Sequence, residues 1–164
     1  ADVPFGIGSG SGVIFGVTGG VTEAVLRRLQ QGHNRVDMES IKKSGVRGDD
    51  GIKVLTYNYN GREIKAAGVN GLANADKVLQ QIKNHEAEYD FVEVMACRRG
   101  CIMGGGQPVN AGPRTRKARM KGLYDTDVNT QIKKSNENPM ILSLYDTLLK
   151  GKEHELLHRN FSGK

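Results

Sequence analysis

Tryptophan is absent from this 164-residue chain, and only four prolines and two cysteines are present. Two cysteines are too few for a disulfide-rich secreted scaffold, for a four-cysteine zinc site or for a complete four-cysteine cluster motif. No apolar run reaches the roughly 20 residues that a transmembrane helix needs, and the first residues lack the charged and apolar regions of a secretory signal. We therefore expect a cytoplasmic protein with no membrane partner.

An initiator methionine is also lacking, since the chain begins at Ala1. Hydrophobic residues make up 37% of the sequence and the mean hydropathy is −0.48, which is sufficient for one modest core. The 22 glycines indicate many tight turns. A glycine-rich chain of this kind, opening in mid-sequence, leads us to expect part of a larger protein.

The most informative stretch is Glu93–Pro108, which reads E-V-M-A-C-R-R-G-C-I-M-G-G-G-Q-P. It contains both cysteines, Cys97 and Cys101. Residues 89–94 before it are rich in β-branched and aromatic side chains, which predicts a buried strand. The thiols therefore follow the carboxyl end of a strand, where open α/β sheets bind ligands. The glycines at 104–106 would let a bulky group approach the backbone.

Two soft thiolates, a glycine cradle and a strand end suit an iron–sulfur cofactor. The C-x-x-x-C spacing differs from the C-x-x-C of zinc ribbons and thioredoxin-like sites, and it is not a full cluster motif. The remaining ligands would have to come from outside this chain. The alternative is a pair of reduced thiols in a glycine-rich turn, without metal.

A second glycine-rich stretch, G-I-G-S-G-S-G-V-I-F-G-V-T-G-G, occupies residues 6–20. It is not a dinucleotide fingerprint, because no convincing strand precedes it, and it lacks the G-K-[ST] of a P-loop. We predict a short strand or turn through Val13–Phe15 and a helix from about Gly20 to Gln31, with Thr18 as N-cap. The apolar face of this helix would comprise Val21, Ala24, Val25 and Leu29.

The segment between these stretches reads as scaffold. A helical turn is expected near Asp37–Lys43, and strands at 52–59 and 62–69 flank the hairpin signal Asn60-Gly61. A helix over about Ala73–His85 would then lead into the strand before the cysteines. Its predicted apolar face comprises Ala75, Val78, Leu79 and Ile82.

The last third of the chain carries most of the +6 net charge. Pro113 suits a first helical position, and residues 114–121, R-T-R-K-A-R-M-K, are basic without interleaved aromatics or an apolar face. This pattern excludes nucleic acid and membrane surfaces as partners. A further helix should run from Pro139 to about Leu149, capped by Asn138. The later H-E-L-L-H matches a zinc-protease motif but leaves no room for a third ligand.

Three segments together carry a family resemblance: G-V-I-F-G-x-T-G-G-V-x-E-A, M-A-C-x-x-G-C-x-x-G-G-G-Q-P, and S-N-E-N-P followed by H-E-L-L-H. The chain resembles the C-terminal half of the catalytic domain of iron-only (FeFe) hydrogenases. The resemblance implies an α/β fold, with a small mixed β-sheet and flanking helices. It also implies a catalytic-domain lobe at residues 1–112 and a helical, small-subunit-like tail at residues 113–164.

The resemblance also implies roles for individual residues. Cys97 would ligate a 4Fe–4S cluster, and Cys101 would bridge that cluster to a two-iron subsite. Met95 would pack beside this subsite, so Cys101 and Met95 are the expected catalytic positions. The residues expected to contact the cofactor are Phe15, Gly16, Met95, Gly104, Gly105 and Gly106.

In the family the complete H-cluster supports reversible reduction of protons to dihydrogen. This chain lacks the signatures T-S-C-C-P-x-W and M-P-C-x-x-K-x-x-E, so by itself it should be inactive and should need the missing N-terminal part of the catalytic domain. Ferredoxin or another acidic electron carrier is the expected redox partner. Arg98 and Arg99 depart from the Pro-Gly or Gly-Gly common in relatives. The alternative is a non-catalytic, Narf-type iron–sulfur protein of cluster assembly.

Overall fold

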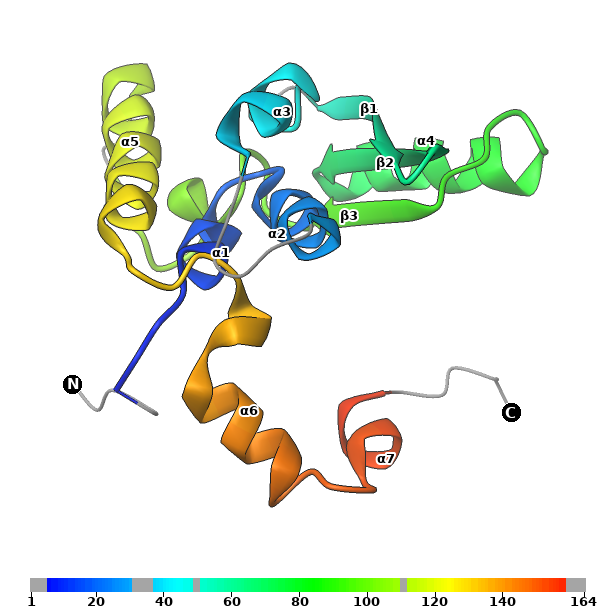
Figure 1. The fold of residues 1–164 in the computed structure, drawn as a ribbon. Coiled ribbons are helices and arrows are strands. Elements are labelled where there is room, and N and C mark those ends of the chain that lie inside the picture. The colour runs from blue at the N-terminus through cyan, green and yellow to red at the C-terminus, as the bar shows by residue number, and fades with distance from the viewer. Residues whose placement is uncertain (1–5, 31–36, 49–50, 110–111, 159–164) are drawn as a thin grey trace.

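The protein has a mixed α/β architecture built on one three-stranded sheet (Figure 1), as the sequence predicts. A computed structural model describes residues 6–30, 37–48, 51–109 and 112–158. The sheet order is β1-β2-β3, with β1 antiparallel and β3 parallel to β2. Ala66 packs in a core with Leu26 and Ile41, whereas its neighbour Ala67 packs in a second core with Val78. Helices therefore cover both faces of the sheet.

Strands β1 (Ile52–Tyr59) and β2 (Arg62–Asn70) form the predicted hairpin. Tyr59 pairs with Arg62 across a two-residue turn. Asn60 and Gly61 in that turn have φ values of 51° and 80°, which is the positive region that a type I′ turn requires. The predicted helical turn after residue 37 is also present, as α3 (Met38–Lys43), capped by the Asp37 side chain.

Helix α4 (Leu72–Lys83) and strand β3 (Phe91–Met95) complete a β-α-β unit that ends at the cysteine loop. Ala75 and Val78 are buried, but Leu79 and Ile82 are 61% and 38% exposed. The predicted apolar face is therefore buried only in the first half of α4. The second half runs back toward the start of β2, where the strand's own side chains are largely exposed and form no core.

The glycine-rich stretch at residues 6–20 is helical rather than extended. It forms α1 (Gly10–Val13), a 3-10 turn η1 (Ile14–Gly16) and then α2 (Gly20–Leu29). The strand alternative for Val13–Phe15 was wrong. The predicted N-cap was also wrong, because Gly19 occupies the cap position with φ 87° and no side-chain cap. The predicted end of this helix at Gln31 lies outside the described residues.

Helix α2 buries charged side chains on the face that we expected to be polar. Glu23 and Arg27 are fully buried, while the predicted apolar face is only half-buried. Arg27 Nη1 and Nη2 each donate to an Asp127 carboxylate oxygen at 2.7 Å, and Arg47 Nε donates to Glu23 at 2.8 Å. Burial acts to lower the pKa of Arg27, but its bonds to Asp127 and Glu23 outweigh this and raise the pKa. These bonds make the buried charges tolerable.

The tail is mostly helical in the described residues. It comprises α5 (Pro113–Asn129, with Pro113 at the first turn), a 3-10 turn η3 (Ser135–Glu137), α6 (Pro139–Asp146) and α7 (Glu153–Leu157). Helix α6 has the predicted Asn138 cap but ends three residues before the predicted Leu149, where Leu149 N–H bonds back to Leu144 O. Among the described helices, none is long and apolar enough to cross a bilayer. The boundary at residue 113 stays a prediction.

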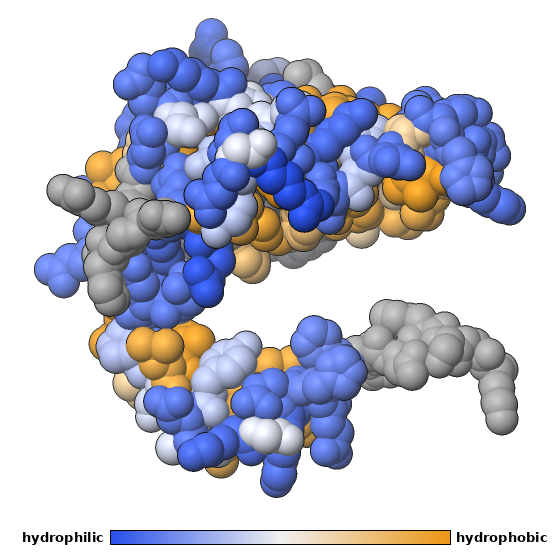
Figure 2. Space-filling view, turned by 45° about the vertical axis from the view of Figure 1, so that its right-hand side comes forward, coloured by the Kyte–Doolittle hydropathy of each residue, from blue (hydrophilic) through white to orange (hydrophobic). Residues whose placement is uncertain are grey.

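The segment that carries α6 and α7 extends away from the body of the molecule (Figures 1 and 2). Figure 2 shows an open gap between this arm and the body. Large apolar side chains on the arm are exposed, among them Leu142 at 49%, Leu148 at 74% and Leu156 at 58%. An exposed apolar surface of this kind marks an interaction site.

The buried ion pair between α2 and α5 generates the first prediction. Replacing Asp127 with Asn removes one of the charges that compensate Arg27 and should lower the free energy of unfolding by about 3–5 kcal/mol. Urea unfolding followed by circular dichroism measures the change.

Asp125→Asn provides the control on the same helix, because Asp125 pairs with Lys121 at the exposed surface. It should change stability by less than about 1 kcal/mol. Equal effects of the two substitutions would show that the buried pair has no special role.

The second prediction concerns alkaline pH. Tyr124 lies beneath the guanidinium of Arg47, 4.0 Å from the ring centroid, and burial raises the pKa of its hydroxyl to about 12. The folded state therefore holds this proton more tightly than the unfolded chain. This contribution to stability is complete below about pH 10 and is lost as the pH rises towards 12.

Tyr124→Phe should reduce the loss of stability between pH 10 and 12 by roughly 2 kcal/mol relative to wild type. Urea midpoints measured at several pH values provide the test. Parallel pH profiles of the two proteins would contradict the assignment.

Candidate functional site

The cysteine loop leaves β3 at Met95 and folds through a series of tight turns. Gly100 N donates to Cys97 O at 3.0 Å, and Gly104 N donates to Cys101 O at 3.1 Å. Cys101 opens a short 3-10 turn, η2 (Cys101–Met103). Both cysteines are free thiols and both are exposed. The loop therefore presents two sulfur donors at the surface.

The carboxylate of Glu93 joins the strand before this loop to the start of α2, where the glycine-rich stretch of residues 6–20 ends. Its two oxygens accept hydrogen bonds from Gly19 N at 2.8 Å, Thr22 N at 2.7 Å and the Thr22 hydroxyl at 2.7 Å. Glu93 is 4% exposed. It thus satisfies the free N–H groups at the start of α2, where the helix dipole also favours an anion.

Sequence analysis missed this role of Glu93. The available signal was an acidic residue within an otherwise apolar strand, which demands a partner when it is buried. The partner could not be identified from the sequence, because it lies more than 70 positions earlier. With Glu93 in place, the strand end before Cys97 is fixed against α2.

Gly16 lies directly beside the cysteine loop. A Cβ atom on Gly100, which has φ +79°, would lie 3.0 Å from Gly16 O and 3.3 Å from the Thr18 hydroxyl. The two backbones are therefore in close contact, and Gly16 also lines a pocket of about 480 Å³ together with Cys101. The structure thus brings together two of the positions singled out by the sequence.

Phe15 points elsewhere. It is 44% exposed and lines a mainly apolar pocket of about 290 Å³ with Val21, Val25 and Leu29 of α2. The half-buried apolar face of α2 therefore belongs to this pocket and not to the core. Phe15 and Cys101 line different pockets in the described chain.

Met95 ends β3, where it pairs with Asn70, and only 9% of it is exposed. The three loop glycines differ from one another. A Cβ on Gly104 would lie 2.9 Å from the Cys97 sulfur, so a side chain there would crowd the thiol. Gly105 faces open space, and Gly106 requires glycine because its φ is +86°.

The residues of this site fit an iron–sulfur group. The two thiols provide soft ligands, and Gly104 leaves the Cys97 sulfur uncrowded. The Thr18 hydroxyl beside Gly100 is buried and finds no hydrogen-bond partner among the described residues. A buried hydroxyl of this kind is a donor ready for an acceptor such as sulfur. Within the described residues no group of three or more His, Cys, Asp or Glu could hold a metal ion. A four-ligand cluster would thus need further ligands.

The loop surface between the cysteines is strongly basic. Arg98 and Arg99 are exposed, and Arg99 has φ +71°, a conformation that costs a non-glycine residue roughly 1–2 kcal/mol. The strained residue is one of two exposed arginines that stand between the two cysteines in the chain. This arrangement favours contact with anionic groups.

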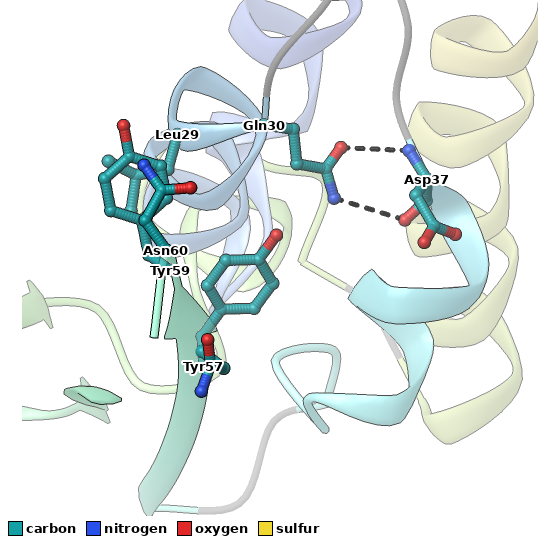
Figure 3. A pocket seen from close by; sticks show the side chains of 7 residues that line it. Leu29, Gln30, Asp37, Tyr57, Tyr59 and Asn60 are labelled. Atoms are coloured by element: carbon teal, nitrogen blue, oxygen red, sulfur yellow. Dashed lines mark hydrogen bonds between the residues drawn. The ribbon is translucent and has the colours of Figure 1, made fainter. Parts of the chain in front are cut away.

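Another pocket, of about 380 Å³, lies at the opposite end of the sheet beside the hairpin turn (Figure 3). Tyr57, Tyr59 and Asn60 line it, and the Gln30 side chain bonds to both backbone polar atoms of Asp37. Among the described residues that line it, there is no cysteine or histidine. His154 and His158 stack at 4.8 Å between ring centroids on the short α7, in the arm. Neither feature contributes to the cysteine site.

Comparison with known families gives two matches along the chain. Residues 1–105 match the family described as "Iron only hydrogenase large subunit, C-terminal domain". "Iron hydrogenase small subunit" matches residues 113–164. The two matches together include the glycine-rich stretch at residues 6–20, both cysteines and the helical tail.

Individual relatives agree. Iron hydrogenase 1 of Clostridium pasteurianum is 37% identical over 96% of this chain, which spans 29% of that relative. The periplasmic [Fe] hydrogenase large subunit of Nitratidesulfovibrio vulgaris is 42% identical over 68% of this chain, which spans 26% of that relative. Because that relative is periplasmic, cytoplasmic location stays a prediction. The chain spans less than a third of either relative.

The Narf-type alternative receives weaker support. The cytosolic Fe–S cluster assembly factor narfl of Danio rerio is 25% identical over 88% of this chain, which spans 36% of that relative. A solved [FeFe]-hydrogenase, studied for oxygen damage to the 2Fe subcluster of its H cluster, is 35% identical with a TM-score of 0.61. The match covers 97% of this chain and 47% of that structure.

A family match over residues 1–105 and 37% identity along nearly the whole chain lead to one conclusion. This chain belongs to the iron-only hydrogenases, a family of enzymes, and matches the C-terminal part of their large subunit together with their small subunit.

Proposed function

We propose that this chain supplies two cysteine ligands, Cys97 and Cys101, to the H-cluster of an enzyme that reversibly reduces protons to dihydrogen. The observation that carries the proposal is the pair of exposed thiols on one loop, held against α2 by the buried Glu93 carboxylate. The cofactor comprises a 4Fe–4S cluster and a two-iron subsite, and when bound it supplies the redox chemistry of hydrogen.

Each residue of the site has a distinct task. Cys97 would ligate the 4Fe–4S cluster, and Cys101 would carry the thiolate shared with the two-iron subsite. Met95 and Gly16 would shape the surroundings of the cofactor, and Gly104, Gly105 and Gly106 would leave space for it. Phe15 would act from the separate pocket that it lines on α2. The buried Thr18 hydroxyl would donate a hydrogen bond to a sulfur, which is a recognised way of tuning a cluster's potential.

The rest of the active site would come from the missing N-terminal part of the catalytic domain. The absent T-S-C-C-P-x-W and M-P-C-x-x-K-x-x-E signatures would supply the other ligands. The gap between the arm and the body, with exposed apolar residues on α6 and α7, supports a large partner surface at that place (Figure 2). The missing part of the catalytic domain would cover these surfaces and exclude water from the cofactor.

An acidic electron carrier such as ferredoxin suits the charge of this chain. Residues 114–121 form the basic first half of α5, and Arg98 and Arg99 add two exposed cations beside the cysteines. Opposite charge speeds encounter between redox partners at low ionic strength.

Our third prediction concerns the chain by itself. Two cysteines cannot complete a cubane, so the 164-residue chain should bind substoichiometric iron and evolve no hydrogen. Anaerobic reconstitution followed by iron quantification and gas chromatography provides the test. Robust hydrogen evolution by the chain without a partner would contradict it.

A separate preparation, of the complete enzyme, distinguishes the proposal from the Narf-type alternative. Infrared bands of iron-bound CO and CN are expected for the hydrogenase and not for a protein that carries only iron–sulfur clusters. Iron without such bands would favour the alternative, and no iron at all would favour free thiols.

The fourth prediction compares two residues of the loop in the complete enzyme. Cys101→Ser should abolish hydrogen turnover, because a hydroxyl is a poor substitute for sulfur on iron. Met95→Leu should retain iron, since such swaps usually cost under roughly 1.5 kcal/mol, but activity should fall because leucine lacks the polarisable thioether. Iron content and hydrogen evolution are measured on both. Iron loss in Met95→Leu with full activity in Cys101→Ser would reverse the assigned roles.

A further inference from the structure

Arg119 of α5 reaches the cysteine loop from the tail. Its Nη1 donates a hydrogen bond to Ile102 O at 2.7 Å, and its Nη2 donates one to Pro108 O at 3.3 Å. These two carbonyls stand on either side of the three glycines at 104–106. One guanidinium therefore joins both ends of the glycine segment to a single point on a helix.

Few other hydrogen bonds of the described residues order the glycine segment. Gly104 N bonds to Cys101 O at 3.1 Å and Gln107 N bonds to Gly104 O at 3.3 Å, but no strand or helix includes residues 104–106. Glycine also loses more conformational freedom on ordering than other residues. A planar guanidinium offers several donors in a fixed fork, so it can hold two carbonyls at once, whereas an ammonium is a single point charge.

Helix α5, which carries Arg119, is anchored to the body of the protein at two places. Met120 and Leu123 pack against the core of Ile14, Val17 and Ile102, and Ile102 is the residue whose carbonyl Arg119 binds. Further along α5, Asp127 is fixed by the buried Arg27. Arg119 therefore extends from a rigid support.

From this geometry we propose that Arg119 is a positioning residue for Cys101. It fixes the backbone that follows Cys101 and thereby sets the direction of the Cys101 sulfur, without itself contacting the cofactor. Its consequence for the cluster rests on the proposed function. Because α5 falls within the small-subunit match at residues 113–164, the tail would position the cysteine loop through Arg119.

The test uses Arg119→Lys, which keeps the charge but loses the fork, with Arg114→Lys as the matched control. Arg114 is an exposed residue in the first turn of the same helix. Hydrogen–deuterium exchange of peptides spanning residues 100–109, and alkylation of Cys101 relative to Cys97, are measured by mass spectrometry on the full metal-free chain.

In Arg119→Lys, exchange in the loop and alkylation of Cys101 should each accelerate about tenfold, whereas Arg114→Lys should match wild type. Arg119→Gln should show at least the same acceleration. Exchange rates in Arg119→Lys equal to wild type would overturn the proposal.

A second readout addresses the cofactor in the complete enzyme. The cluster's midpoint potential, determined by redox titration with EPR detection, should shift in Arg119→Lys and not in Arg114→Lys. A loosened loop with an unchanged potential and iron content would overturn the positioning role. If the wild-type complete enzyme binds no iron, the proposed function is refuted. Faster exchange of the loop in Arg119→Lys would in that case still establish that Arg119 orders the loop.

Discussion

The arrangement of the site depends on one buried carboxylate. Glu93 lies in the middle of β3 and accepts three hydrogen bonds from the start of α2. The interaction orders two segments at once, because it caps a helix that has a glycine at its N-cap and fixes the strand that delivers the cysteines. Without it, the N–H groups of Gly19 and Thr22 would be buried and unpaired, at a cost of about 1–3 kcal/mol each.

A second buried interaction places the tail. The Arg27 guanidinium bonds to Glu23 on its own helix and to Asp127 on α5. Gly10 packs against the Asp127 carboxylate, and a Cβ atom at position 10 would lie 2.0 Å from a carboxylate oxygen. This ion pair is specific in geometry because a bidentate guanidinium–carboxylate contact tolerates little displacement. It holds α5 where Arg119 can reach the cysteine loop, so the tail and the ligand loop share one framework.

The described chain is ordered around an incomplete site. The thiols, Phe15 and the apolar face of α2 are open, and the arm leaves a gap beside the body. Exposed apolar surface of this extent is unusual in a protein that acts alone. It fits a chain that spans 47% of a related solved structure.

Local elements and the position of the candidate cysteine site could be predicted from the sequence. Asn60-Gly61 specified a hairpin, Pro113 and Asn138-Pro139 marked helix starts, and the two cysteines beside three glycines identified the site, because each signal acts between neighbours in the chain. Three polar contacts depend instead on how the elements pack: Glu93 caps α2, Arg27 pairs with Asp127, and Arg119 binds the carbonyl of Ile102. Two of these contacts join residues about 70 or more positions apart, and all of them depend on which surfaces meet in space. Hydrophobic periodicity carries no information about such polar pairs, which is why α2 was expected to bury its apolar face and buries Glu23 and Arg27 instead.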